Sequence, residues 1–200
     1  MFIVGITGGT GAGKTSVLRA LKTLGALALD CDAIYHELLA DNENLKTELE
    51  ARFAGITKDG KIDRKTLGVI VFNDPEALSQ LNTITHKYVG DEIERRIAEW
   101  ETQGGKIAAI DAIALIESGR SKKCDVVIGV KAPVETRVKR IMKRDGMTRE
   151  QAEDRINAQK PAEFYKENCD YLLEGTYGTP KEFKEKCIEF FTELLKGQSQ

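Results

Sequence analysis

The sequence predicts an α/β fold built on a parallel sheet of five strands. Short apolar runs alternate with helical patterns along the 200 residues, an order typical of βαβ units. The runs Ile107–Ile110 and Val126–Ile128 are apolar throughout, as expected of strands that helices cover on both faces. The expected strands are Phe2–Ile6, Ala26–Asp30, Ile107–Asp111, Val126–Val130 and Tyr171–Leu173.

Helices are expected between these strands, and the longest helical stretch lies between the second strand and the third. Asp74-Pro75 marks a helix start within it, with Asp74 as the N-cap. Two capping boxes, Thr148–Gln151 and Thr179–Glu182, predict two later helices. The last helix carries an apolar stripe that would pack on the sheet. The stripe consists of Phe183, Cys187, Phe190, Phe191 and Leu194.

Residues 1–200 are expected to form a single domain, because domains usually contain about 100–200 residues. Its α/β core would comprise residues 1–32, 105–135 and 169–200. Residues 33–104 would form a helical lobe over the mouth of the glycine-rich loop that follows the first strand, and residues 136–168 a helical lid.

A glycine-rich segment, Gly8–Thr15, follows the first expected strand and reads GGTGAGKT. It matches G-x-x-x-x-G-K-[ST], the P-loop pattern, and a strand before it and a helix after it are the context the mechanism requires. Backbone N–H groups of such a loop surround phosphate oxygens, aided by the helix N-terminus. Lys14 would reach the outer phosphates, and the Thr15 hydroxyl would bind Mg²⁺. The sequence therefore predicts a three-layer P-loop fold that binds a nucleoside triphosphate.

Two carboxylates, Asp30 and Asp32, follow the second apolar run. Ligands of doubly wound sheets bind at the carboxyl ends of the strands, and residues two apart on a strand point to the same side. One carboxylate would accept a proton from an attacking hydroxyl or hold Mg²⁺ through water. The alternative is a helix cap, which is common for Asp at a strand–helix junction. Asp32 is the favoured functional residue of the pair, because it ends an apolar strand that is expected to lie next to the P-loop strand, where substrate and phosphates can meet.

A further carboxylate, Asp111, ends the third expected strand. A P-loop enzyme places a carboxylate that organises Mg²⁺ at such a strand end. Asp111 and Asp32 are therefore the two candidates to assist Thr15 at the metal, and the alternative for Asp111 is a turn residue.

One expected helix places three guanidinium groups on one face. These groups belong to Arg137, Arg140 and Arg144. Arg155 and Gln159 follow on the next expected helix. Phosphoryl transfer needs positive charge around the transferring group and a lid that excludes water. Arg140 and Arg144 are predicted to supply that charge, whereas the alternative is a solvated face with Glu135 and Asp145 as partners.

The composition argues against several other classes of protein. A net charge of −2 disfavours a nucleic-acid partner, and no apolar run approaches the roughly 20 residues that span a bilayer. The first strand leads directly into the P-loop, so the N-terminus does not have the pattern of a signal peptide. The four cysteines are widely spaced and the chain has only two histidines, which disfavours a zinc site and favours reduced cytoplasmic thiols.

Together these segments resemble the dephospho-coenzyme A kinase family, and the resemblance extends from about Phe2 to Phe183. The order and spacing of the matching segments are specific to that family, whereas a P-loop by itself is shared by many enzymes. The matching segments are Thr7–Thr15, Leu29–Ile34, Asp59–Leu67, Val71–Glu76, Leu81–Asn82, His86, Asp111–Glu117 and Arg137–Asp145.

The resemblance implies transfer of the γ-phosphoryl group of ATP, with Mg²⁺, to the ribose 3′-hydroxyl of dephospho-coenzyme A. This reaction is the last step of coenzyme A biosynthesis. The resemblance also makes the helical lobe of residues 33–104 the one that binds the substrate. The expected partners are these two small molecules, without nucleic acid or membrane, and the expected state is a cytoplasmic monomer or weak homo-oligomer. The resemblance makes Asp32 the base and brings His86 and the lid arginines into the binding site, although a lone helical histidine is more often structural.

The predicted site residues follow from both lines of reasoning. Lys14, Asp32 and Arg140 are expected to be catalytic. The expected ATP-binding residues are Gly8, Gly11, Ala12, Gly13, Lys14, Thr15, Ser16, Arg140 and Arg144. The expected substrate-binding residues are Asp32, His86, Asp111 and Arg155.

Two alternative functions are weighed against this one. Another P-loop small-molecule kinase or nucleoside monophosphate kinase would share the loop and the lid but not the matches at Leu29–Ile34 and Asp59–Pro75. A GTPase-type switch would carry an N-K-x-D motif that reads the base, and the sequence contains no such run.

Overall fold

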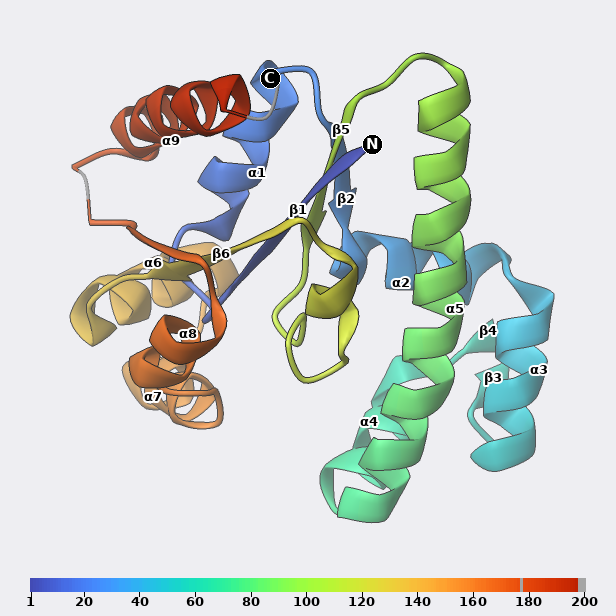
Figure 1. Cartoon of the computed structure of the whole chain (residues 1–200). Coiled ribbons are helices and arrows are strands. Elements are labelled where there is room, and N and C mark those ends of the chain that lie inside the picture. The colour runs from blue at the N-terminus through green and yellow to red at the C-terminus, as the bar shows by residue number, and fades with distance from the viewer. Residues whose placement is uncertain (177, 198–200) are drawn as a thin grey trace. The chain divides into compact units, whose positions relative to one another are not determined.

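The computed structural model describes residues 1–176 and 178–197. The chain divides into two compact units, the first formed by residues 1–29 and 100–200 and the second by residues 30–99. Figure 1 shows the course of the chain through them.

A five-stranded sheet with the order β2-β5-β1-β6-β7 organises the first unit. The central strand β1 pairs in parallel with both β5 and β6, and β6 pairs in parallel with β7. All five predicted strands are confirmed, with ends that differ by no more than two residues. The strands are β1 (Phe2–Gly8), β2 (Leu27–Asp30), β5 (Ile107–Asp111), β6 (Val126–Lys131) and β7 (Tyr171–Glu174).

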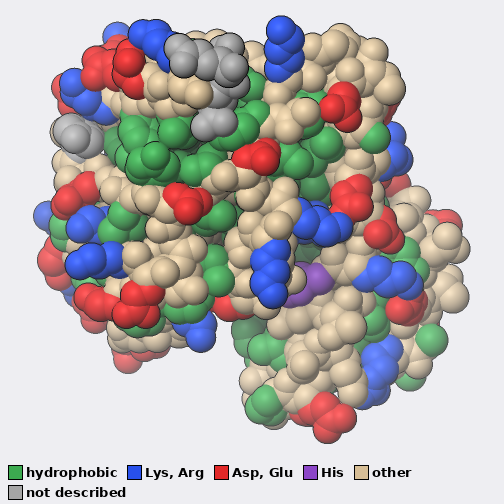
Figure 2. All heavy atoms as spheres, viewed as in Figure 1, with side chains coloured by type: hydrophobic (Ala, Val, Ile, Leu, Met, Phe, Trp, Pro, Cys, Tyr) green, Lys and Arg blue, Asp and Glu red, His purple; other side chains and the backbone are tan. Residues whose placement is uncertain are grey.

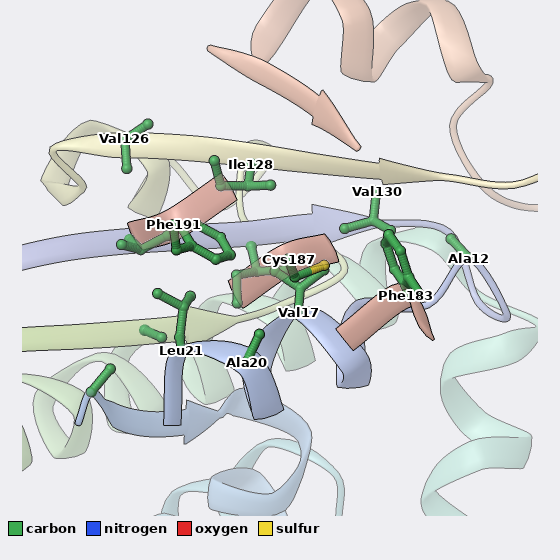
Figure 3. Packing of buried hydrophobic residues seen from close by; sticks show 14 residues of the cluster. Ala12, Val17, Ala20, Leu21, Val126, Ile128, Val130, Phe183, Cys187 and Phe191 are labelled. Atoms are coloured by element: carbon green, nitrogen blue, oxygen red, sulfur yellow. The ribbon is translucent and has the colours of Figure 1, made fainter. Parts of the chain in front are cut away.

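Two helices, α1 (Lys14–Thr23) and α9 (Pro180–Lys196), pack side by side against the sheet (Figure 1). Figure 3 shows their apolar side chains meeting those of β1 and β6 in one cluster. The predicted stripe of α9 is confirmed, because Phe183, Cys187 and Phe191 are buried in this cluster and the other two stripe residues pack against it. The predicted capping box at Thr179 is also confirmed and begins this helix.

Three shorter helices, α6 (Val134–Asp145), α7 (Arg149–Asn157) and α8 (Ala162–Asn168), lie between β6 and β7 in the chain. The predicted capping box at Thr148 begins α7. A small apolar cluster joins α6 to α7 and is separate from the main one. It consists of Val138, Ile141, Ala152 and Ile156, with Met147 packed against it.

The second unit is mostly helical, as the sequence predicts. Its helices are α2 (Cys31–Asp41), α3 (Glu43–Arg52), α4 (Arg64–Phe72) and most of α5 (Pro75–Thr102). Asp74 caps α5 as predicted, since its side chain accepts hydrogen bonds from the backbone N–H groups of Glu76 and Ala77.

A small antiparallel hairpin in the second unit is absent from the sequence prediction. Its strands are β3 (Thr57–Lys58) and β4 (Lys61–Ile62). Asp59 and Gly60 form the turn with φ of 51° and 72°, as a two-residue turn with positive φ at both positions requires. Strands of two residues show no periodicity, so only the Asp-Gly pair could have signalled this hairpin.

The surface carries charged side chains of both signs, as expected of a chain with 30 lysines and arginines and 32 aspartates and glutamates. On the face in Figure 2, basic and acidic side chains are interspersed. Within residues 1–176 and 178–197, no helix is both long and apolar enough to cross a bilayer.

Candidate active site

The P-loop runs from the end of β1 into α1. Gly8, Gly11 and Gly13 have φ of 142°, 77° and 118°, a region that favours glycine because it has no Cβ. At Gly8 a Cβ would lie 2.2 Å from the carbonyl oxygen of Val130 on the neighbouring strand. These glycines therefore allow the backbone to turn at the end of the central strand, where a residue with a side chain would be strained.

Lys14 begins α1, and its side chain turns back over the loop. Its Nζ donates a hydrogen bond to the carbonyl oxygen of Gly8 at 3.0 Å. Thr15 and Ser16 follow in the first turn of α1, and the N–H of Ser16 donates to the carbonyl oxygen of Gly13 at 2.9 Å. A helix N-terminus and an ammonium group together favour a bound phosphate.

Asp111 lies at the same edge of the sheet as the P-loop. It ends β5 and is opposite Ile6 of β1 in the register of the sheet. The residue is buried, with 8% of its surface exposed. The hydroxyl of Thr7 donates to the carbonyl oxygen of Ile113 at 2.9 Å, which ties the segment after β5 to the end of β1.

The chemistry of these side chains fits a magnesium ion. The hydroxyl of Thr15 and the carboxylate of Asp111 are hard oxygen donors, the kind that Mg²⁺ prefers. Among the described residues no three His, Cys, Asp or Glu side chains form a group that could hold a metal. Mg²⁺ in kinases keeps several waters and binds substrate phosphates with only one or two protein ligands, and the oxygens of Thr15 and Asp111 could serve as those ligands.

Arg140 on α6 reaches the carbonyl side of the P-loop. Its Nη1 lies 3.0 Å from the oxygen of Gly11 and 3.3 Å from that of Ala12, and its Nη2 lies 2.6 Å from the oxygen of Gly175. Burial lowers the pKa of Arg140. In the described chain its partners are carbonyl oxygens and no carboxylate, so its positive charge at the P-loop is not neutralised.

Two other predicted residues, Arg144 and Arg155, both contact Asp145. Arg144 donates from Nε and Nη2 to the two carboxylate oxygens at 2.7 and 2.8 Å, and Arg155 donates from Nη1 at 2.9 Å. The guanidinium of Arg144 and the charge of Arg155 lower the pKa of Asp145. The structure thus brings Arg140, but not Arg144, to the P-loop, and Asp145 is a partner as the alternative interpretation anticipated.

Asp30 and Asp32 do not share the face of one strand. The strand β2 ends at Asp30 and α2 begins at Cys31, so Asp32 lies in the first turn of a helix. The side chain of Asp30 accepts hydrogen bonds from the N–H groups of Asp32 and Ala33 at 3.0 and 3.1 Å. The expectation that both carboxylates project from one strand is wrong, and Asp30 is the helix cap.

Asp32 is exposed within the second unit. The expectation that the strand before Asp32 lies next to the P-loop strand is wrong, because β5 separates β2 from β1 in the sheet. His86 is also exposed in the second unit and lies on α5.

Three residues at the P-loop were not among the predicted site residues. Thr10 is buried, with 4% of its surface exposed, and it contacts Arg137 and Gln159 from the segment after β6. Gln159 lies just beyond α7 rather than on it. Thr10 occupies a variable position of the motif, and no local pattern links it to residues 127 and 149 positions away.

Comparisons of the sequence with those of known proteins point to one family of kinases. A family model described as dephospho-CoA kinase matches residues 2–180. Dephospho-CoA kinase from Thermobifida fusca is 38% identical over 98% of both chains, and the enzyme of the same name from Geobacter sulfurreducens is 37% identical over 96% of this chain and 98% of its own.

Solved structures agree as well. A Thermus thermophilus protein superposes with a TM-score of 0.83 at 31% identity, covering 97% of each chain. Dephospho-CoA kinase from Campylobacter jejuni gives 0.69 at 26% identity over 98% of each chain. Shikimate kinase from Acinetobacter baumannii, 22% identical with a TM-score of 0.57 over 96% of this chain and 94% of its own, shares the fold.

Proposed function

We propose a division of catalytic roles among the residues of this chain, which belongs to the dephospho-CoA kinase family. The chain is an enzyme that transfers the γ-phosphoryl group of ATP to the ribose 3′-hydroxyl of dephospho-CoA, which yields CoA and ADP in the last step of CoA biosynthesis. We further propose that it works in the cytoplasm as a monomer or weak homo-oligomer, without a nucleic-acid or membrane partner.

The P-loop holds the phosphates of ATP in this proposal, through Gly8, Gly11, Ala12, Gly13, Lys14, Thr15 and Ser16. The observation that carries it is Lys14 turned back over the loop, with Nζ 3.0 Å from the carbonyl oxygen of Gly8. A lysine in that position can follow the β- and γ-phosphates as a point charge.

Mg²⁺ is the proposed cofactor, held by the hydroxyl of Thr15 with the carboxylate of Asp111 or Asp32, directly or through water. When bound, it would neutralise charge on the phosphates. The burial of Asp111 at the edge of the sheet that carries the P-loop supports its part in this set.

The lid, residues 136–168 in this proposal, supplies cationic groups. Arg140 has five N–H donors, and three of its contacts use Nη1 and Nη2. Nε and a second hydrogen on Nη2 therefore remain to bind a phosphate oxygen. Arg144 would reach the phosphates only by exchanging its contact with Asp145.

Asp32 is the proposed base, in a second unit that we propose to be the lobe for dephospho-CoA. The 3′-hydroxyl loses its proton to the Asp32 carboxylate while its oxygen forms a bond to the γ-phosphorus. The bond from that phosphorus to the bridging oxygen breaks, and ADP leaves with the electron pair. His86, Asp111 and Arg155 are proposed to contact the substrate.

Product analysis tests the reaction and its acceptor. We expect ATP with dephospho-CoA to give CoA and ADP, and shikimate or nucleoside monophosphates to give no phosphorylated product. Phosphate at another position of dephospho-CoA would contradict the assignment, and phosphate NMR distinguishes the positions.

Loss of turnover in EDTA, restored by Mg²⁺, is expected if Thr15 and a carboxylate hold the metal.

Arg140→Ala tests the proposed cationic role. We expect kcat to fall about 10²-fold, the usual effect of removing one donor to a developing charge, with a smaller change in the KM for ATP. Lys139→Ala, an exposed change on the same helix, serves as the control and should behave as wild type. Equal effects of the two substitutions on kcat would contradict the role.

A further inference from the structure

Three hydrogen bonds join Thr10 of the P-loop to Arg137 and Gln159, and a fourth joins Arg137 to Gln159. Oε1 of Gln159 accepts from the backbone N–H of Thr10 at 2.9 Å and from Nη2 of Arg137 at 2.6 Å. Its Nε2 lies 2.6 Å from the hydroxyl oxygen of Thr10, and Nε of Arg137 donates to the carbonyl oxygen of Thr10 at 2.8 Å. Every polar group of Thr10 is thus engaged by the two side chains, and we call this set of three residues the Thr10 latch.

The latch determines which way two peptide units of the P-loop face. A trans peptide is planar, so its C=O and N–H point in opposite directions, and the described chain contains no cis peptide. When Arg137 holds the carbonyl of Thr10, the N–H of Gly11 in the same peptide must face the other way. When Gln159 holds the N–H of Thr10, the carbonyl of Gly9 must also face the other way, and it accepts from the N–H of Ala12 at 3.1 Å.

Gly9 gives independent support for this arrangement. Its φ does not require glycine, since it is not among the positive-φ residues of the described chain. A Cβ at this position would lie 2.2 Å from Nη2 of Arg137 and 2.9 Å from Oε1 of Gln159. The glycine at this variable position of the motif therefore leaves space for the latch.

The positive charge of Arg137 makes its hydrogen bonds to Thr10 and Gln159 important. Arg137 is half-buried and contacts two neutral oxygens, so burial lowers its pKa. A partly desolvated cation with neutral partners is costly, and its hydrogen bonds to Thr10 and Gln159 offset part of that cost. Loss of either partner should therefore displace the guanidinium and release the loop.

We infer that Arg137 and Gln159 are positioning residues that hold the P-loop in its phosphate-binding shape before ATP arrives. The inference rests on the proposed function, because it assigns the peptide of Thr10 to the lid and the N–H of Gly11 to the phosphates. The hydrogen bonds of the latch hold the backbone of the P-loop, so the inference predicts an effect on binding of the phosphoryl donor and none on binding of the acceptor.

Substitutions at Thr10 and Gln159 test the latch. Thr10→Val keeps the shape of the side chain but removes the hydroxyl, and we expect the KM for ATP to rise about 3- to 10-fold, as for one lost hydrogen bond. Gln159→Met leaves the N–H of Thr10 without its acceptor, and the rise should reach about 10- to 100-fold. Thr10→Ser should restore the wild-type value, and kcat and the KM for dephospho-CoA should stay within about twofold in all three.

Three controls make the result decisive. The double variant with Thr10→Val and Gln159→Met should have the same KM for ATP as Gln159→Met alone, because the effects of substitutions at contacting residues are not additive. In the single variants the Kd for ADP, measured by calorimetry, should rise together with the KM for ATP. Lys139→Ala should change none of these values. A lower melting temperature with an unchanged KM for ATP, or equal changes in the KM of both substrates, would overturn the inference.

Failure of the latch and failure of the proposed function have different signatures. If Lys14→Ala retained full activity, the P-loop assignment itself would fail. If Lys14→Ala were inactive while Gln159→Met matched Lys139→Ala, only the latch would be refuted.

Discussion

Lys14→Ala is expected to lower kcat/KM for ATP by about 10³-fold or more while the protein still folds. The ammonium group follows the phosphates from ground state to transition state, where charge moves onto the bridging oxygen. Electrostatic groups that face developing charge in a site of low dielectric have the largest single effects on rate. Steady-state kinetics over a wide range of ATP concentrations measures the loss.

The same substitution should have little effect on stability. Lys14 is partly exposed in the first turn of α1, and its contact with Gly8 is to one carbonyl oxygen. Alanine is the best helix former, so the thermal midpoint should stay close to that of wild type. Lys22→Ala, an exposed lysine in the last turn of α1, is the matched control, and near-normal turnover of Lys14→Ala would refute the P-loop assignment.

The central strands of the sheet could be predicted from the sequence because β1, β5 and β6 are mostly buried and therefore consist of apolar runs. The helix starts at Asp74, Thr148 and Thr179 could be predicted because capping is a local property of a few residues. The P-loop is likewise local, since its glycines, lysine and threonine are neighbours in the chain.

The failures have a common physical cause, which is that they depend on contacts distant in sequence or on where one element gives way to the next. The helix α2 begins one residue after β2 ends, so Asp30 became a cap and Asp32 joined the helix. The strand β5, and not β2, lies beside β1, because the order of strands in a sheet depends on packing between distant segments and is not encoded in any single strand. The Thr10 latch joins residues 127 and 149 positions apart.

Asp32→Asn is expected to lower kcat by about 10²- to 10⁴-fold, the usual contribution of a general base. The amide has nearly the size of the carboxylate and can still hydrogen-bond, but it cannot take the proton of the 3′-hydroxyl. A loose phosphoryl-transfer transition state develops little bond to the nucleophile, so the base acts by orienting the hydroxyl and receiving its proton. Binding of ATP and dephospho-CoA should therefore stay nearly normal, as calorimetry with each substrate can measure.

Asp30→Asn is the matched control for Asp32→Asn, because the two residues are neighbours on either side of Cys31 and only one of them caps α2. Asparagine is as good an N-cap as aspartate, so this variant should keep both its stability and most of its kcat. The exposed carboxylate of Asp32 accepts no cap hydrogen bond in α2, so its loss should leave the helix in place and change the reaction alone. If Asp32→Asn kept most of its turnover while Asp111→Asn lost it, the assignment of the base to Asp32 would be wrong, and Asp111 at the end of β5 would be the candidate for the base.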